Sequence, residues 1–68
     1  MKIRLNGEPY HVDGEPTVSQ LLTRLDIDSR RVAVEHNLIV LKRHLYDSTT
    51  VREGDEIEIV NFVGGGLS

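Results

Sequence analysis

Alternating apolar and polar residues predict a half-buried β-strand at each end of the chain. Over residues 1–6 every second residue is apolar, and in an extended strand this period of two buries one face. Residues 56–62 repeat the pattern, with Ile57 and Ile59 on one face. Both segments are long and half-apolar, so we expect them to pair in the centre of one sheet.

A hairpin and a helix are expected between these two strands. Asn6-Gly7 favours a two-residue turn because both residues tolerate positive φ, and Pro9–Val12 is then the returning strand. Thr17 and Gln20 have the spacing of a capping box, which opens a helix. An apolar stripe at helical spacing follows, made of Val18, Leu21, Leu22 and Leu25. A helix of about ten residues cannot fold alone, so this stripe must face a core.

The second half of the chain predicts further strands. Arg31–His36 is a short, buried strand, and after a turn the apolar segment Leu38–Leu41 returns beside it. Residues 42–49 are a short strand or a turn of 3₁₀ helix around Leu45. A turn at residues 53–55 leads into the last strand.

This order of hairpin, helix, strand, short strand and strand defines an α+β fold. A sheet packed on one helix makes a two-layer domain, and a right-handed crossover through the helix requires that the strands it joins be parallel. The expected fold is a ubiquitin-like β-grasp with a mixed sheet of about four to five strands. We expect residues 1–63 to form the domain and residues 64–68 to form a flexible, glycine-rich tail.

Composition and charge narrow the function classes. The chain has 68 residues and no cysteine, which excludes disulfides, thiolate metal sites and a cysteine nucleophile. No segment approaches the ~20 apolar residues of a membrane span, so a soluble cytoplasmic protein is expected. The net charge of −3 and the lack of a basic stripe argue against nucleic-acid binding. The pairs Arg30-Arg31 and Lys42-Arg43 are interpreted as solvated loop charges.

The chain offers no catalytic constellation. The three histidines, His11, His36 and His44, have neither the mutual spacing nor the flanking carboxylates of a zinc site. No serine lies in a nucleophile elbow. We therefore expect no enzyme activity, no metal and no bound cofactor, and we interpret the histidines as structural or solvated.

The glycine run Gly64–Gly66 directly follows the last strand. A tail without Cβ atoms is thin enough to thread a narrow channel, although a frayed, inert terminus has the same composition. Val60 and Phe62 alternate with the inward-facing isoleucines, so they point outward beside this tail. We expect them to dock a partner. The alternative is that Phe62 covers the edge of the core.

The chain closely resembles the ThiS family, the small sulfur carriers of thiamin biosynthesis. The resemblance covers almost the whole chain and rests on four segments and the tail. These are Met1–Gly7, the helix opening Thr17–Leu22, the strand Val32–Asn37, the turn 53–55 and the end Val60–Gly66.

The resemblance implies a mechanism in which other proteins supply the catalysis. An ATP-consuming, ThiF-like activating enzyme adenylates the carboxylate of Gly66. Sulfur supplied through a cysteine desulfurase converts the acyl-adenylate to a thiocarboxylate, and a ThiG-like thiazole synthase takes the sulfur. Val60, Phe62, Val63, Gly64 and Gly65 are the expected partner-binding residues.

One feature departs from the family pattern, because these carriers end on glycine and this chain continues with Leu67-Ser68. Either the two residues are removed before activation, or they are foreign to the natural chain, or the protein is not a thiamin carrier. The alternatives are a carrier for molybdopterin or amino-acid sulfur that needs its tail removed, and a β-grasp module that only binds proteins.

Overall fold

A computed structural model describes residues 1–62. Its elements, in chain order, are β1 (Lys2–Leu5), β2 (Glu8–His11), α1 (Val18–Arg24), η1 (Ser29–Arg31), β3 (Val32–His36), β4 (Ile39–Leu41), η2 (Arg43–Leu45) and β5 (Glu56–Asn61). The predicted order of strands and helix is therefore confirmed. The expected boundary between residues 63 and 64 lies outside the described residues.

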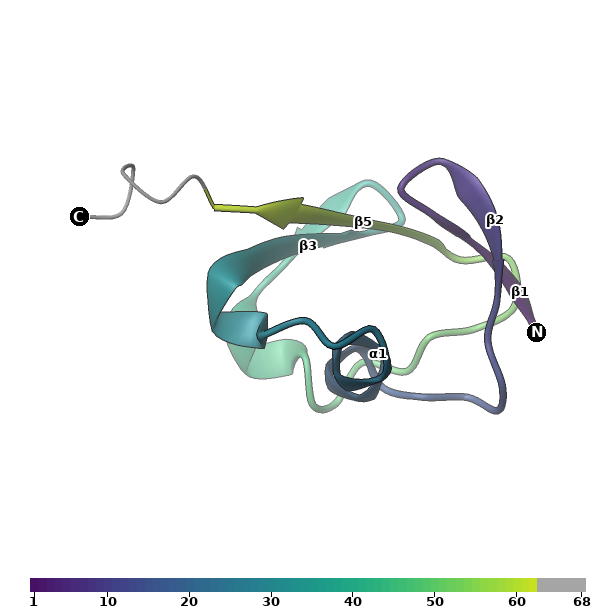
Figure 1. The fold of residues 1–68 in the computed structure, drawn as a ribbon, viewed down its shortest axis with the longest axis horizontal. Helices are drawn as coiled ribbons and strands as arrows, with labels where there is room; N and C mark the ends of the chain where they lie inside the picture. Colours follow the sequence, from purple (N-terminus) through teal and green to yellow (C-terminus); the bar gives the residue numbers. More distant parts are fainter. Residues whose placement is uncertain (63–68) are drawn as a thin grey trace.

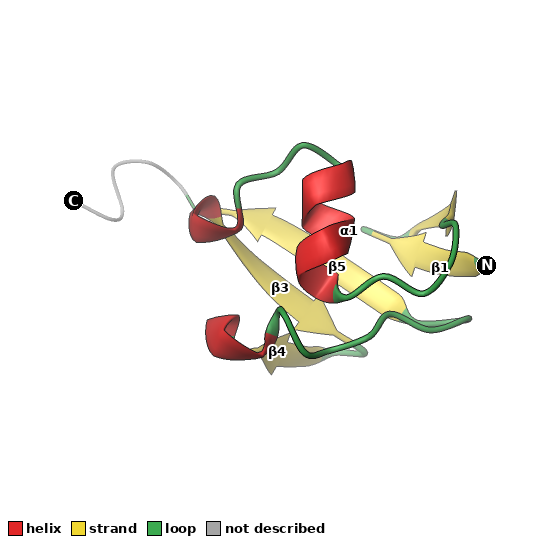
Figure 2. Ribbon diagram, turned by 90° about the horizontal axis from the view of Figure 1, so that it is seen from below, coloured by secondary structure: helices red, strands yellow, loops and turns green. Residues whose placement is uncertain are grey.

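The five strands form one mixed sheet in the order β2-β1-β5-β3-β4. β1 and β5 are parallel and lie next to each other in the sheet, as the alternation at the two chain ends predicts. The other pairings, β1 with β2, β3 with β4 and β3 with β5, are antiparallel. Figure 1 shows α1 beneath one face of this sheet, and Figure 2 shows it from the helix side. This arrangement is the expected β-grasp.

The core lies between α1 and the inward residues of the sheet. Its fully buried members are Ile3, Val12, Val18, Leu21, Leu22, Val32, Val34, Tyr46, Val51 and Ile57. Leu25 and Ile59 are partly buried against this cluster. The helix stripe and the inward isoleucines of β5 were predicted, whereas Tyr46 and Val51 were not.

Both ends of α1 are closed by hydrogen bonds. At the start, Gln20 N–H donates to the Thr17 hydroxyl, and Thr17 N–H donates to the Gln20 side chain, so the capping box is confirmed. At the end, Ile27 N–H donates to the Leu22 carbonyl and Asp26 N–H to the Thr23 carbonyl. This is a Schellman motif with Asp26 at φ 60. It turns the chain sharply and returns Ile27 to the core edge.

Several predicted boundaries shift. Arg31 belongs to the turn η1 rather than to the following strand, because Asp28 caps that turn by accepting a hydrogen bond from Arg30 N–H. Leu38 lies in the β3–β4 turn rather than in β4. Of the two alternatives for residues 42–49, the structure shows the 3₁₀ turn, at Arg43–Leu45.

Candidate functional site

The candidate site is the sheet face turned away from α1, together with the end of β5 from which residues 63–68 continue. We call this the outer face. Val60 is 55% exposed and Phe62 is 36% exposed, and neither belongs to the core cluster. Val63, Gly64, Gly65, Gly66, Leu67 and Ser68 lie outside the described residues, so their predicted roles stay predictions.

The strand register shows which side chains share the outer face with Val60. Ala33 on β3 pairs with Val60, and the next outward pair along the strands is Glu35 with Glu58. Val40 on β4 pairs with Glu35 on its other side and is 66% exposed. The outer face therefore carries an apolar strip crossed by two carboxylates, which is a composition suited to a protein partner.

Arg43 fixes the point where β5 ends. Its Nη2 donates to the Val32 carbonyl at 3.0 Å, and its guanidinium lies 5.7 Å from the centre of the Phe62 ring. Phe62 N–H donates to the Arg31 carbonyl at 3.0 Å. Because a guanidinium over an aromatic face is attractive, Arg43 clamps the Phe62 ring against the start of β3.

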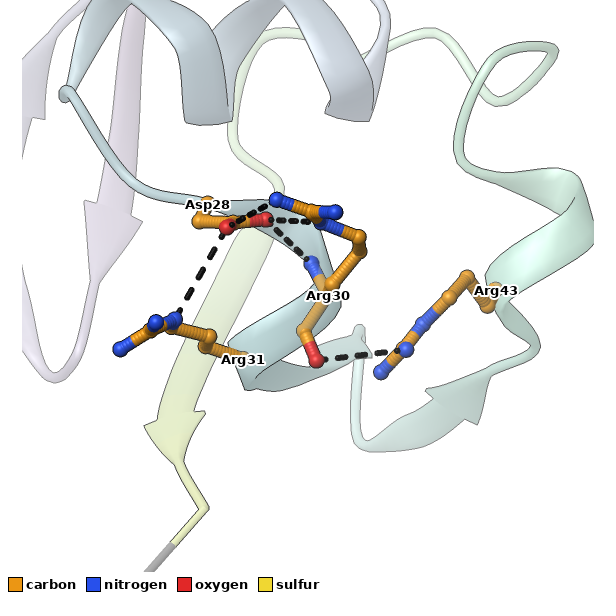
Figure 3. Close-up of polar contacts among 4 residues, drawn as sticks. All are labelled: Asp28, Arg30, Arg31 and Arg43. Atoms are coloured by element: carbon orange, nitrogen blue, oxygen red, sulfur yellow. Dashed lines mark hydrogen bonds and ion pairs between the residues drawn. The ribbon is translucent and has the colours of Figure 1, made fainter. Parts of the chain in front are cut away.

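The role of Arg43 corrects the sequence interpretation. The sequence indicates a pair of solvated loop charges at Lys42-Arg43, but in the structure Arg43 also reaches the Arg30 carbonyl at 3.5 Å (Figure 3). No local sequence motif predicts these contacts of Arg43, because the two carbonyls that it reaches lie 11 and 13 residues earlier in the chain. The alternative that Phe62 covers the edge of the core also changes. The Phe62 ring packs beneath the Arg43 guanidinium and does not belong to the core cluster.

A compact charge cluster lies beside this clamp (Figure 3). Asp28 accepts hydrogen bonds from Arg30 Nη2 at 2.9 Å and Nε at 3.1 Å, and Arg31 Nε lies 3.8 Å away. The hydrogen bond from the Arg30 side chain, helped by the one from its backbone N–H, lowers the pKa of Asp28 to about 2. Asp28 therefore stays ionised at any physiological pH and holds the two arginines at the tail end of the sheet.

A second polar network closes the opposite end of the sheet. His36 Nε2 lies 2.8 Å from Asp55 Oδ2, and Asp55 also accepts from the Arg52 backbone N–H and the Asn37 amide. Burial acts to raise the pKa of Asp55, but the hydrogen bonds from His36, Arg52 and Asn37 outweigh it and lower that pKa. His36, for which the sequence indicates a structural or a solvated role, thus ties β3 to the loop before β5.

We expect Asp55→Ala to destabilise the fold by about 1–3 kcal/mol, because it leaves the partly buried His36 ring and two exposed donors, Asn37 and the Arg52 N–H, without an acceptor. The depressed pKa means that the stabilisation is present above the ordinary value of 3.8 and is lost as pH falls through the lower folded-state value. The difference in the free energy of unfolding between wild type and Asp55→Ala, measured by urea unfolding, should therefore shrink below pH ~4.

The chain contains a matched control for this substitution. His11 and Asp13 form a pair at 3.0 Å, but their side chains are 74% and 93% exposed. Asp13→Ala should change stability by less than ~0.5 kcal/mol. Equal effects of the two substitutions would contradict the structural role assigned to Asp55.

The remaining candidates give no further site. Within residues 1–62 no group of three His, Asp or Glu side chains could hold a metal ion. Among the helices described, none has the length and apolarity to cross a membrane.

The comparisons with known proteins agree with this geometry at the level of the fold. The chain superposes on the crystal structure of a thiamine biosynthesis protein (ThiS) from Geobacter metallireducens with a TM-score of 0.86. The two are 42% identical, and the alignment covers 97% of this chain and 100% of that one. The architecture is therefore that of the small, ubiquitin-like β-grasp carriers.

The family follows from the sequence comparisons. Residues 3–66 match the ThiS family. The sulfur carrier protein ThiS of Bacillus subtilis is 36% identical over 94% of this chain and 98% of its own length. The chain belongs to the ThiS family, whose members are small sulfur carriers rather than enzymes. The resemblance identified from the sequence is thereby confirmed.

Two of the relatives are much longer than this chain. A protein of Paramagnetospirillum magneticum named thiazole synthase is 46% identical over 97% of this chain, and this chain spans only 20% of its length. In that protein a segment like this chain is joined to a larger polypeptide.

Proposed function

We propose that this chain carries sulfur for the thiazole ring of thiamin as a thiocarboxylate on Gly66. The observation that carries the proposal is the ThiS family match, which runs through the glycine tail and ends at Gly66. Leu67 and Ser68 lie beyond that match, so the reactive form is the chain that ends at Gly66.

The chemistry requires activation from outside the carrier. A carboxylate is a poor electrophile, so one of its oxygens first attacks the α-phosphorus of ATP and pyrophosphate leaves. The desulfurase takes sulfur from cysteine as a persulfide, and a thiol reductant supplies the two electrons that convert this sulfur to the hydrosulfide level. The hydrosulfide then attacks the acyl carbon. The C–S bond forms as the C–O bond to AMP breaks, and a proton is released. The carrier contributes its end group and a docking face and binds no cofactor of its own.

Three partners follow from this sequence of steps. A ThiF-like activating enzyme uses the ATP, a cysteine desulfurase supplies the sulfur, and a ThiG-like thiazole synthase accepts it. The relative named thiazole synthase supports the last partner, because its chain includes a segment similar to this carrier. Glycines at the end of the tail let one carboxyl group enter two different active sites.

The test detects the replacement of one carboxylate oxygen atom by sulfur. The chain ending at Gly66 is incubated with a purified activating enzyme, ATP, cysteine, a desulfurase and the thiol reductant dithiothreitol, and its intact mass is measured. The mass should rise by the difference between one sulfur and one oxygen atom. Thiazole synthase with its substrates should then reverse the change. An unchanged mass in the first step would refute the thiocarboxylate, and transfer only to a different sulfur acceptor would refute the thiamin assignment.

We predict that Phe62→Ala weakens binding of the carrier to the activating enzyme. The aromatic ring lies at the foot of the tail under Arg43, where a partner that takes up the tail must contact it. We expect the affinity for the activating enzyme to fall by more than ~1 kcal/mol, measured by titration calorimetry, while the melting curve keeps a cooperative transition.

Tyr10→Ala is the matched control, since Tyr10 is an aromatic residue of similar exposure, 38%, on the distant edge strand β2. Its loss should leave the affinity unchanged. If Phe62→Ala instead abolished folding, the ring would be a core residue and the docking role would fail.

A further inference from the structure

The two hairpins of the sheet use the same kind of turn with different residues. In the first, Asn6 (φ 50) and Gly7 (φ 83) connect β1 to β2; in the second, Asn37 (φ 52) and Leu38 (φ 71) connect β3 to β4. Positive φ at both central positions defines a type I′ turn, which favours glycine at the second. Leucine in this left-handed conformation is strained.

The side chain of Leu38 gains no burial in return for this strain, and hydrogen bonds of Asn37 hold the turn in place. Asn37 N–H donates to the Glu56 carbonyl, Glu56 N–H donates to the Asn37 side chain, both at 2.8 Å, and the Asn37 amide reaches Asp55. The Leu38 side chain is 72% exposed. Strain that the surroundings enforce and that gains no burial is characteristic of functional positions.

Leu38 continues into an exposed apolar edge. Ile39 is 72% exposed and Val40 is 66% exposed, both on β4, the last strand of the sheet. We call Leu38, Ile39 and Val40 the β4 tip. Three residues of edge strand are too short to hold a second copy of the chain by strand pairing, since a stable interface buries about 1,200 Å² or more. A short apolar projection of this kind is of the size that a pocket on a larger partner accommodates.

The charges beside the β4 tip indicate what rims that pocket. Glu35 lies next to Val40 on the outer face and directly opposite Glu58 on β5. Like charges in this position destabilise a sheet, and neither carboxylate forms an ion pair within residues 1–62. A lysine or arginine of a partner would relieve this repulsion.

We propose that the β4 tip docks into an apolar pocket of thiazole synthase that is rimmed by basic side chains. The inference rests on the function proposed above. Thiazole synthase is the occupant because the Paramagnetospirillum protein of that name contains a carrier-like segment as 20% of its own chain. In that protein a covalent link keeps the carrier-like segment beside the rest of the chain.

The experiment separates strain from docking by reciprocal substitutions, made in the chain that ends at Gly66. Leu38→Gly relieves the strain and removes the apolar side chain. It should raise the melting temperature by about 4 °C and weaken binding to purified thiazole synthase at least ~5-fold in calorimetry. Leu38→Asn, which also tolerates positive φ, should weaken binding similarly.

Gly7→Leu is the matched control. No atom lies within 4 Å of a Cβ built on Gly7, so this substitution adds only backbone strain. It should lower the melting temperature and leave binding to thiazole synthase unchanged. A melting temperature that rises in Leu38→Gly and falls in Gly7→Leu, with binding weakened only by the Leu38 substitutions, would show that Leu38 serves docking at a cost in stability.

The experiment distinguishes a failure of the docking role from a failure of the proposed sulfur-carrier function. Unchanged binding of both Leu38 variants, or a lower melting temperature in Leu38→Gly, overturns the docking role and leaves the sulfur-carrier function standing. Impaired adenylation with unchanged binding to thiazole synthase overturns the choice of partner. Absence of any binding by the wild-type carrier overturns both the proposed acceptor and this inference.

Discussion

Leu22→Ala is expected to lower the free energy of unfolding by about 2–5 kcal/mol. Leu22 is 1% exposed, lies in the core cluster and also accepts the Ile27 N–H that closes the helix end. A seven-residue helix such as α1 has no stability of its own in water. Its place in the fold therefore depends on the leucine side chains that pack on the sheet. In a domain of this size such a loss is a large fraction of the total stability.

The measurement is urea unfolding followed by circular dichroism. Thr23→Ala, on the exposed side of the same helix turn, should change stability by less than ~0.5 kcal/mol. Leu25→Ala should fall between the two, because Leu25 is only partly buried at the helix C-cap. An unchanged urea midpoint in Leu22→Ala would mean that α1 does not pack as described.

The framework of the fold is predictable because each element has a periodic or local signal. Alternation predicts β1 and β5, the Asn6-Gly7 pair predicts the first hairpin, and the capping box with its stripe predicts α1. The structure reproduces all of these. The parallel pairing of β1 with β5 follows from topology. The helix α1 joins β2 to β3, and these two strands run in the same direction, as a crossover requires. Their antiparallel partners β1 and β5 are therefore parallel to each other.

The parts that escape prediction depend on contacts between distant residues. Tyr46 is 3% exposed although it lies in a polar, irregular stretch, and only its packing against other segments buries it. Arg43 likewise gains its role from carbonyls at the start of β3. The sequence predicts the turn of the second hairpin, but the strain in that turn is visible only in the φ angle of Leu38.

The candidate site also has one part that the sequence predicts and another that depends on contacts between distant residues. The outward direction of Val60 follows from alternation and is confirmed by its 55% exposure. The state of Phe62 beneath Arg43 could not be read from the sequence, because a cation–π contact has no spacing rule between a 3₁₀ turn and a strand end. The tail roles of Gly64–Gly66 rest on the family match alone.

The last two residues of the chain should decide whether the carrier can be charged. We expect the chain ending at Gly66 to form the thiocarboxylate and the 68-residue chain to form none under identical conditions. Adenylation needs a free carboxylate at the end of the glycine tail. In the full chain the Gly66 carbonyl belongs to a peptide bond with Leu67, and an amide oxygen does not capture AMP in this reaction. Leu67 also adds a branched side chain where the channel must admit glycine.

Intact-mass spectrometry of both lengths, with the same activating enzyme, ATP and sulfur source, makes the comparison. Gly65→Ala in the shorter chain tests the steric part of the argument. It keeps the terminal carboxylate and adds one methyl group, so charging should slow without being abolished. A chain ending at Gly65 is the control for reach, since it offers the same carboxylate one residue earlier. Equal charging of the 68-residue chain, with its mass showing no loss of Leu67 and Ser68, would move the reactive group away from Gly66 and leave the chain's final carboxylate as the acceptor.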